Sequence, residues 1–137
     1  MSQLPEILVI KSDKKELSIV EDFLEGIFRK NHLNKKNFSN VLLCVSEAIL
    51  NSIYHGNVNH REKTIEIRVI FKNNDNIFVE VRDEGEGFDY TKIDDPTLNI
   101  NLKKESGRGL HIIKSLCKKI EFREGGSCIC LNINLSE

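Results

Sequence analysis

Two segments with alternating apolar and polar residues are joined by a short polar turn at 73–76. The apolar side chains of both segments recur at every second position: Ile65, Ile67, Val69, Phe71, Ile77, Val79 and Val81. Successive side chains of a strand point to opposite faces, so a period of two predicts strands. The pattern therefore predicts a β-hairpin with one buried face.

Two segments before this hairpin carry apolar residues at helical spacing. The first helix is predicted from Lys14 to Phe28, after a short strand at 7–10. A second helix is predicted to run to about His55, with Asn37 or Ser39 as its cap and Gly56 as its stop. Both helices are expected to cover the apolar face of the hairpin.

The rest of the chain predicts one more helix and two more strands. The helix opens at 107–109, and the strands at 120–123 and 128–135 are turned at 125–126. The segment 88–106 has no periodicity and exceeds a usual connection, which indicates a functional lid or a disordered insert. This order predicts an α+β two-layer sandwich, with helices on one face of a mixed, mostly antiparallel sheet.

Length and charge limit the classes of function. The 137 residues fit one domain, 1–137, and 20 basic residues balance 21 acidic ones. We therefore expect neither direct nucleic-acid binding nor membrane association, and a cytoplasmic location without a signal segment. The four cysteines lack the C-x-x-C spacing of zinc sites and are interpreted as reduced core thiols, with Cys128 and Cys130 on one face of a strand.

The first candidate for chemistry is the pair Glu47 and Asn51 on the second predicted helix. Four residues correspond to about 40° around a helix, so both side chains can reach one ligand. A carboxylate and an amide oxygen suit Mg²⁺ or the orientation of a nucleophile. The alternative is a solvated surface pair.

The second candidate is the turn Asp83-Glu84-Gly85-Glu86-Gly87, directly after a predicted strand. Its glycines allow a sharp turn and a close ligand, while Asp83 can accept a hydrogen bond from an exocyclic amine such as that of adenine. An ordinary charged turn is the alternative. Neither a Walker A loop nor a G-x-G-x-x-G fingerprint occurs in the chain.

The third candidate is the start of the last predicted helix, Gly107-Arg108-Gly109-Leu110. Free N–H groups and the positive end of the helix dipole attract phosphate there, and glycines permit close approach. An ordinary glycine-containing helix start is the alternative.

In this order the three motifs resemble the asparagine box and the two glycine boxes of the GHKL ATPases, which include gyrase, a heat-shock chaperone, histidine kinases and MutL. The segments 47–57 and 107–113 resemble more closely the small anti-sigma-factor serine kinases of bacteria. The resemblance extends over essentially the whole chain. It implies a Bergerat-type ATP-binding fold with an ATP lid at about 89–106.

The resemblance also implies roles for the motif residues. Asn51 would be the Mg²⁺ ligand, Glu47 the general base and Asp83 the partner of the adenine amino group. The remaining expected contacts to ATP come from the glycine boxes, from two residues beside them and from the last strand: Gly85, Gly87, Gly107, Arg108, Gly109, Leu110 and Ser127.

Some of these positions leave alternatives open. Ser127 stands where the family usually has a threonine near the adenine. Arg108 would reach the γ-phosphate or a partner, His55 could shape the helix end or touch the ligand, and Lys103 and Lys104 could be phosphate neighbours or solvated charges.

The function implied is an ATP-dependent protein serine kinase and anti-sigma factor of a partner-switching system. Such kinases use Mg²⁺, phosphorylate a STAS-domain anti-anti-sigma protein and sequester a sigma factor, often as a homodimer. Two alternatives stay open: an ATP-binding regulatory module without kinase activity, and a detached histidine-kinase-like ATPase domain. Glu47 favours the kinase, because a pure binder has no use for a base.

Overall fold

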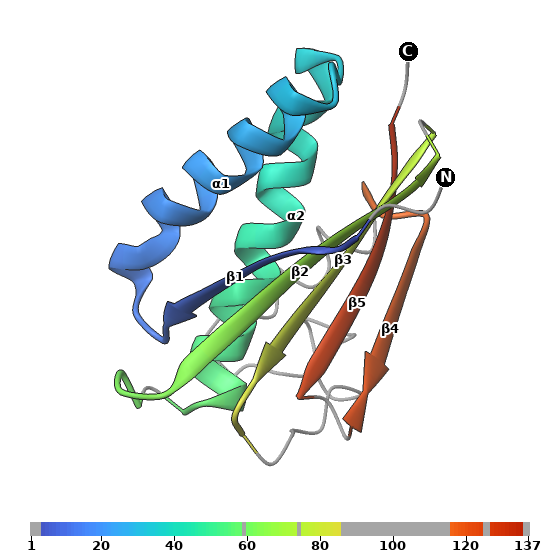
Figure 1. The fold of residues 1–137 in the computed structure, drawn as a ribbon. Helices are drawn as coiled ribbons and strands as arrows, with labels where there is room; N and C mark the ends of the chain where they lie inside the picture. The colour runs from blue at the N-terminus through green and yellow to red at the C-terminus, as the bar shows by residue number, and fades with distance from the viewer. Residues whose placement is uncertain (1–3, 59, 74, 86–115, 125–126, 136–137) are drawn as a thin grey trace.

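The computed structural model describes residues 4–58, 60–73, 75–85, 116–124 and 127–135 (Figure 1). Its principal elements are β1 (Glu6–Lys11), α1 (Leu17–Lys30), α2 (Phe38–Asn51), β2 (Thr64–Asn73), β3 (Asn76–Asp83), β4 (Lys119–Arg123) and β5 (Cys128–Asn134). Short 3₁₀ turns precede both helices, at Lys14–Glu16 and Lys35–Asn37, and a π-helical turn, Ser52–Gly56, extends α2. The third predicted helix falls almost wholly outside the described residues.

The strands form one sheet in the order β1-β2-β3-β5-β4. The predicted hairpin is confirmed as β2 and β3, with Ile67 opposite Val81 and Val69 opposite Val79. Every pairing among the described strands is antiparallel, whereas the sequence indicated a mixed sheet. The predicted α+β two-layer sandwich is confirmed, because both helices pack on one face of this sheet (Figure 1).

The core lies between the sheet and the two helices. Six inward residues of the hairpin are at most 1% exposed: Ile65, Ile67, Val69, Ile77, Val79 and Val81. From the helices, Val20, Leu24, Val45 and Ile49 are fully buried against them. Each such side chain contributes roughly 1.5–3 kcal/mol relative to an exposed one. This packing fixes the end of α2 against the end of β3.

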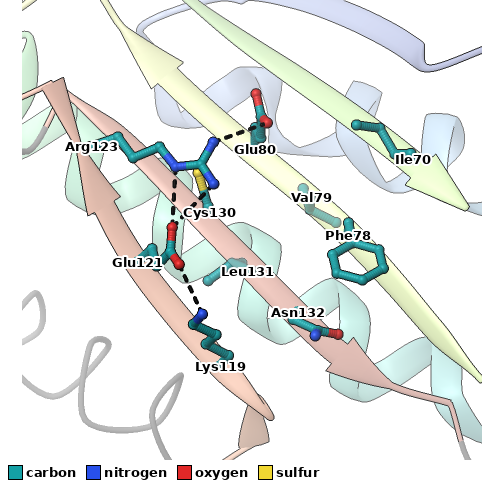
Figure 2. Close-up of a pocket in the computed structure, with 10 residues that line it drawn as sticks. All are labelled: Ile70, Phe78, Val79, Glu80, Lys119, Glu121, Arg123, Cys130, Leu131 and Asn132. Carbon is teal, nitrogen blue, oxygen red and sulfur yellow. Dashed lines mark hydrogen bonds and ion pairs between the residues drawn. The ribbon is translucent and has the colours of Figure 1, made fainter. Parts of the chain in front are cut away.

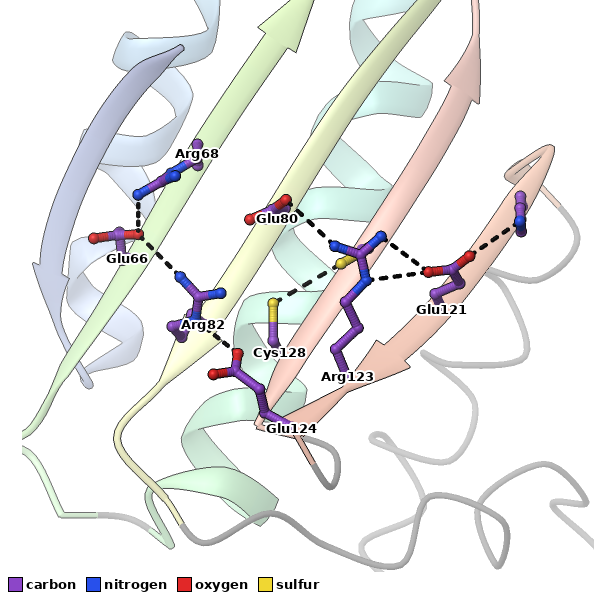
Figure 3. A network of polar contacts seen from close by, with 10 residues as sticks. Glu66, Arg68, Glu80, Arg82, Glu121, Arg123, Glu124 and Cys128 are labelled. Carbon is purple, nitrogen blue, oxygen red and sulfur yellow. Dashed lines mark hydrogen bonds and ion pairs between the residues drawn. The ribbon is translucent and has the colours of Figure 1, made fainter.

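The opposite face of the sheet carries ion pairs. Arg123 lies 3.9 Å from Glu80 and 3.1 Å from Glu121. All three side chains line a hollow of about 410 Å³, which Figure 2 shows. Figure 3 shows a second group of ion pairs on the same face around Arg82, which pairs with Glu124 at 2.9 Å and Glu66 at 3.7 Å. Exposed pairs of this kind contribute little to the free energy of unfolding. Their charges therefore keep this face of the sheet soluble and add little to its stability.

The cysteines divide between the two faces. Cys44 is part of the core, and Cys117 packs against it. Cys128 and Cys130 do share one strand face, as predicted, with their sulfurs 3.9 Å apart (Figure 3). That face is the one with the ion pairs. Cys128 is fully buried there and Cys130 half-buried, so the interpretation as reduced buried thiols is confirmed for Cys128, although neither belongs to the core cluster between the sheet and the helices. Burial raises the pKa of Cys128 to about 12, which keeps this thiol protonated.

Candidate functional site

The last residue of α2, Asn51, is a buried amide without visible partners. Its side chain is 1% exposed, and neither Oδ1 nor Nδ2 has a hydrogen-bond partner among the described residues. A buried polar group left unpaired costs about 1–3 kcal/mol. Such groups call for an explanation, and a ligand that binds this amide supplies one. The alternative of a solvated Asn51 is wrong.

Glu47 lies one turn earlier on the same helix, and its side chain is half-buried. The helix is regular from Phe38 to Asn51, so Glu47 and Asn51 are separated by about one helical turn, as predicted. Their side chains therefore leave α2 on the same side, about 40° apart. This geometry places a carboxylate beside the unpaired amide.

The turn after Asn51 changes from α-helical to π-helical, over Ser52–Gly56. Isolated π turns of this kind frequently occur at functional sites. Gly56, at its end, lies so close to Asp83 that a Cβ would overlap the Asp83 carboxylate. A Cβ on Gly85 would in turn overlap the carbonyl oxygen of Gly56. Both positions therefore require glycine for the end of β3 to pack against α2.

Asp83 ends β3 and is 7% exposed. Its Oδ1 accepts a hydrogen bond of 2.7 Å from the Gly85 N–H, whereas Oδ2 is buried without a partner of regular geometry among the described residues. Burial raises the pKa of the Asp83 carboxyl, although the Gly85 N–H and the nearby Ser52 hydroxyl oppose this. Oδ2 is thus a buried acceptor that can receive a hydrogen bond from a ligand. An ordinary charged turn would leave such a carboxylate oxygen exposed to water.

Ser127 is brought next to Asp83 by strand pairing, where β3 and β5 lie side by side. Its carbonyl oxygen accepts the Asp83 N–H at 2.9 Å. Its hydroxyl donates to the carbonyl oxygen of Glu124 at 3.0 Å. Ser127 therefore lies beside Asp83, and its hydroxyl is hydrogen-bonded within its own turn, while its contact with ATP stays a prediction.

A buried residue that was not predicted from the sequence, Asn57, joins these elements. Its Oδ1 accepts the Glu84 N–H at 2.9 Å, and its Nδ2 donates to the Thr64 carbonyl at 3.2 Å. Glu84 in turn accepts hydrogen bonds from the N–H and the hydroxyl of Thr64. Asn57 is the last residue of the segment 47–57 that carries the resemblance, and it directly follows the predicted helix stop, where asparagine is a common turn residue.

Replacing Asn57 with alanine should loosen this end of the fold. The substitution leaves the Glu84 N–H and the Thr64 carbonyl without their partner, so we expect a loss of about 1–3 kcal/mol in the free energy of unfolding. Urea unfolding measures it. Asn40→Ala on the exposed side of α2 is the matched control and should cost nothing. Equal stability of the two variants would contradict the role of Asn57.

The remaining predicted contacts lie outside the described residues. These are Gly87, the helix start Gly107, Arg108, Gly109 and Leu110, and the lid at 89–106 with Lys103 and Lys104. Their roles stay predictions. His55 is half-buried within the π-helical turn. A hollow of about 340 Å³ borders the same turn beside Tyr54.

No helix in the described part of the chain is long and apolar enough to span a membrane. A family model described as the histidine kinase-like ATPase domain matches residues 10–133. The serine-protein kinase RsbW of Staphylococcus aureus strain MSSA476 is 27% identical over 130 residues, which cover 89% of this chain and 81% of that protein. RsbW of strain Newman matches with the same identity and coverage.

Solved structures show the same fold. The RsbU and RsbW domains of Rv1364c from Mycobacterium tuberculosis superpose with a TM-score of 0.65 at 13% identity, over 96% of this chain and 32% of that one. The histidine kinase domain of a blue-light activated kinase from Erythrobacter litoralis gives a TM-score of 0.51 at 22% identity, over 72% of this chain and 45% of that one. The chain thus spans less than half of either structure.

Proposed function

Because the chain belongs to the histidine kinase-like ATPase domain family, we propose that it is an ATP-dependent serine kinase and anti-sigma factor of a partner-switching system. The observation that carries this proposal is the joint position of Asn51 and Asp83. Both are buried, both have unpaired side-chain atoms among the described residues, and Gly56 links their elements. In the proposed complex, Asp83 Oδ2 accepts a hydrogen bond from the adenine amino group.

The chemistry proposed for Glu47 is general base catalysis. As the oxygen of an acceptor serine forms its bond to the γ-phosphorus of ATP, the bond from that phosphorus to the bridging oxygen breaks and ADP leaves. The hydroxyl proton passes to the Glu47 carboxylate. The half-buried position of Glu47, one turn before Asn51, suits this role.

The residues also fit a magnesium ion. Mg²⁺ is commonly bound by one or two protein oxygens together with water and substrate phosphates, and it neutralises charge that develops on the phosphoryl group. Asn51 Oδ1, buried and unpaired in the described structure, is the oxygen we assign to it. No group of three His, Cys, Asp or Glu side chains that could hold a metal occurs among the described residues.

We assign three protein partners by the resemblance to the anti-sigma-factor kinases. These are a STAS-domain anti-anti-sigma protein as phosphoacceptor, a sigma factor and a second copy of the chain. For the homodimer, Ile7 and Val9 on the edge strand β1 are 47% and 57% exposed. Apolar residues on an edge strand, whose outer side pairs with no other described strand, favour contact with another chain.

The direct test uses labelled ATP, Mg²⁺, the purified protein and the STAS-domain protein with which it pairs. Transfer of label to a serine, identified by mass spectrometry, would support the kinase. Tight ATP binding without any transfer would favour the regulatory module instead. Label on a histidine would favour a histidine-kinase-like domain.

Nucleotide binding is tested separately with Asn51→Ala. Removing the assigned metal ligand should weaken ATP binding by about tenfold or more when Mg²⁺ is present, and much less when it is chelated. Isothermal titration with and without Mg²⁺ measures both values. Asn40→Ala, exposed on the same helix, should bind like the native protein. An ATP affinity of Asn51→Ala equal to the native value would refute the site.

A further inference from the structure

The connection between α1 and α2 forms an apolar groove at the far end of the helical layer. Phe28 and Phe38 meet there edge to face, with ring centres 5.2 Å apart, and Leu33 lies beside them. The groove has a volume of about 520 Å³, and its charged lining residues are Glu25, Arg29 and Lys35. Figure 1 shows this tip at the end of the helices opposite to the end of β3.

Basic residues outnumber acidic ones around the groove, where Glu25 is the one acidic residue among those that line it in the described structure. No aspartate or glutamate occurs in the sequence between Glu25 and Glu47, although the whole chain has a net charge of −1. Of the four lysines and arginines in this stretch, Lys30 pairs with Glu6 at 3.7 Å. Arg29, Lys35 and Lys36 are exposed, and none of them forms an ion pair with a described residue. The tip is therefore a local exception to the balanced charge of the chain.

Helix stability accounts for only half of this charge. Arg29 and Lys30 lie in the last turn of α1, where cations complement the helix dipole. Lys35 and Lys36 instead precede the first turn of α2, where the dipole is already positive and no acidic residue compensates it. Their placement costs stability in the isolated chain. An anionic partner would reverse that cost.

We propose that this groove binds an acidic segment of a partner protein that places aliphatic or aromatic side chains against Phe28, Leu33 and Phe38. The carboxylates of the segment would pair with Arg29, Lys35 and Lys36. The 14 residues of α2 separate this groove from Asn51 by about 20 Å at 1.5 Å per residue. The proposal therefore does not depend on nucleotide binding and adds a second recognition surface to the proposed function.

Fluorescence anisotropy with three labelled peptides tests the proposal on the full chain. The first peptide alternates leucine and phenylalanine with pairs of glutamates, the second has serine for each apolar residue, and the third has lysine for each glutamate. The first should bind about tenfold or more tightly than either control, because both charge and apolar contact are required. Arg29→Glu with Lys35→Glu should abolish this preference. Lys14→Glu with Lys118→Glu, exposed charges outside the groove, should preserve it.

Each other outcome overturns the proposal. Equal binding of the acidic and the serine peptide would show a simple polyanion surface, and tighter binding of a duplex DNA would show a nucleic-acid surface. Absence of saturable binding would show that the groove is not a recognition site. Amide chemical shifts locate the complex: changes at Phe28, Leu33 and Phe38 support the groove, whereas changes confined to the sheet contradict it.

Discussion

Replacing Glu47 with glutamine should lower phosphoryl transfer to a serine acceptor by about 10²–10⁴-fold, the usual contribution of a general base. Glutamine keeps the size and the hydrogen-bonding capacity of the side chain and removes its ability to take the proton. ATP affinity should change by less than about threefold, because the adenine and metal contacts are assigned to Asp83 and Asn51. Single-turnover transfer of labelled phosphate and nucleotide titration measure the two effects separately.

The contrast with Asn51→Ala makes this prediction specific. Loss of Asn51 should weaken Mg²⁺-dependent ATP binding, whereas loss of the Glu47 carboxylate should spare binding and slow the chemistry. Unfolding measurements on Glu47→Gln control for a structural effect, since the side chain is only half-buried. Transfer at the native rate by Glu47→Gln would remove Glu47 from the reaction and leave another group to accept the proton.

The fold was predictable because its determining patterns are local. Alternation in the hairpin and helical spacing before it depend on which side chains are apolar, and both were confirmed as β2, β3, α1 and α2. The shared face of Cys128 and Cys130 was predicted, but not that this face is the one away from the helices. A period of two shows that both thiols share a face. Cysteine is found on either face of a sheet, so its presence does not identify the face that meets the helices.

The candidate site was predictable only where a motif names the residue. Asn51 and Asp83 were expected from spacing and resemblance, and the structure adds that both are buried with unpaired atoms among the described residues. Asn57 was missed because its contacts join residues distant in sequence, Thr64 and Glu84. The close approach of Gly56 to Asp83 was missed for the same reason. Such contacts arise from packing, which periodicity does not encode.

Asp83→Asn should weaken ATP binding and strengthen the fold of the nucleotide-free protein at neutral pH. A hydrogen bond to a charged acceptor contributes about 1.5–3 kcal/mol, so the expected loss of ATP affinity is about 10–100-fold. Without nucleotide, the buried carboxylate has an unpaired Oδ2 in the described structure, and ionising it costs free energy. Asparagine keeps an oxygen for the Gly85 N–H and removes the charge.

The pH dependence follows from the raised pKa of Asp83. A carboxyl whose pKa is higher in the folded than in the unfolded state stabilises the fold below its unfolded pKa of about 3.9. That contribution is lost as pH rises through the folded value. The asparagine of Asp83→Asn does not titrate. The melting temperature of the variant, relative to that of the native protein, should therefore rise between about pH 4 and pH 7.

Saturating ATP should reverse the order of stability at pH 7. A ligand that binds only the folded state stabilises it according to its concentration relative to Kd, and the native protein has the lower Kd. Thermal melts with and without ATP therefore distinguish two roles of one carboxylate. If Asp83→Asn melted below the native protein without nucleotide at neutral pH, the charge would be stabilising the turn through Gly85. Asp83 would then be part of the framework of the pocket and not an acceptor kept for adenine.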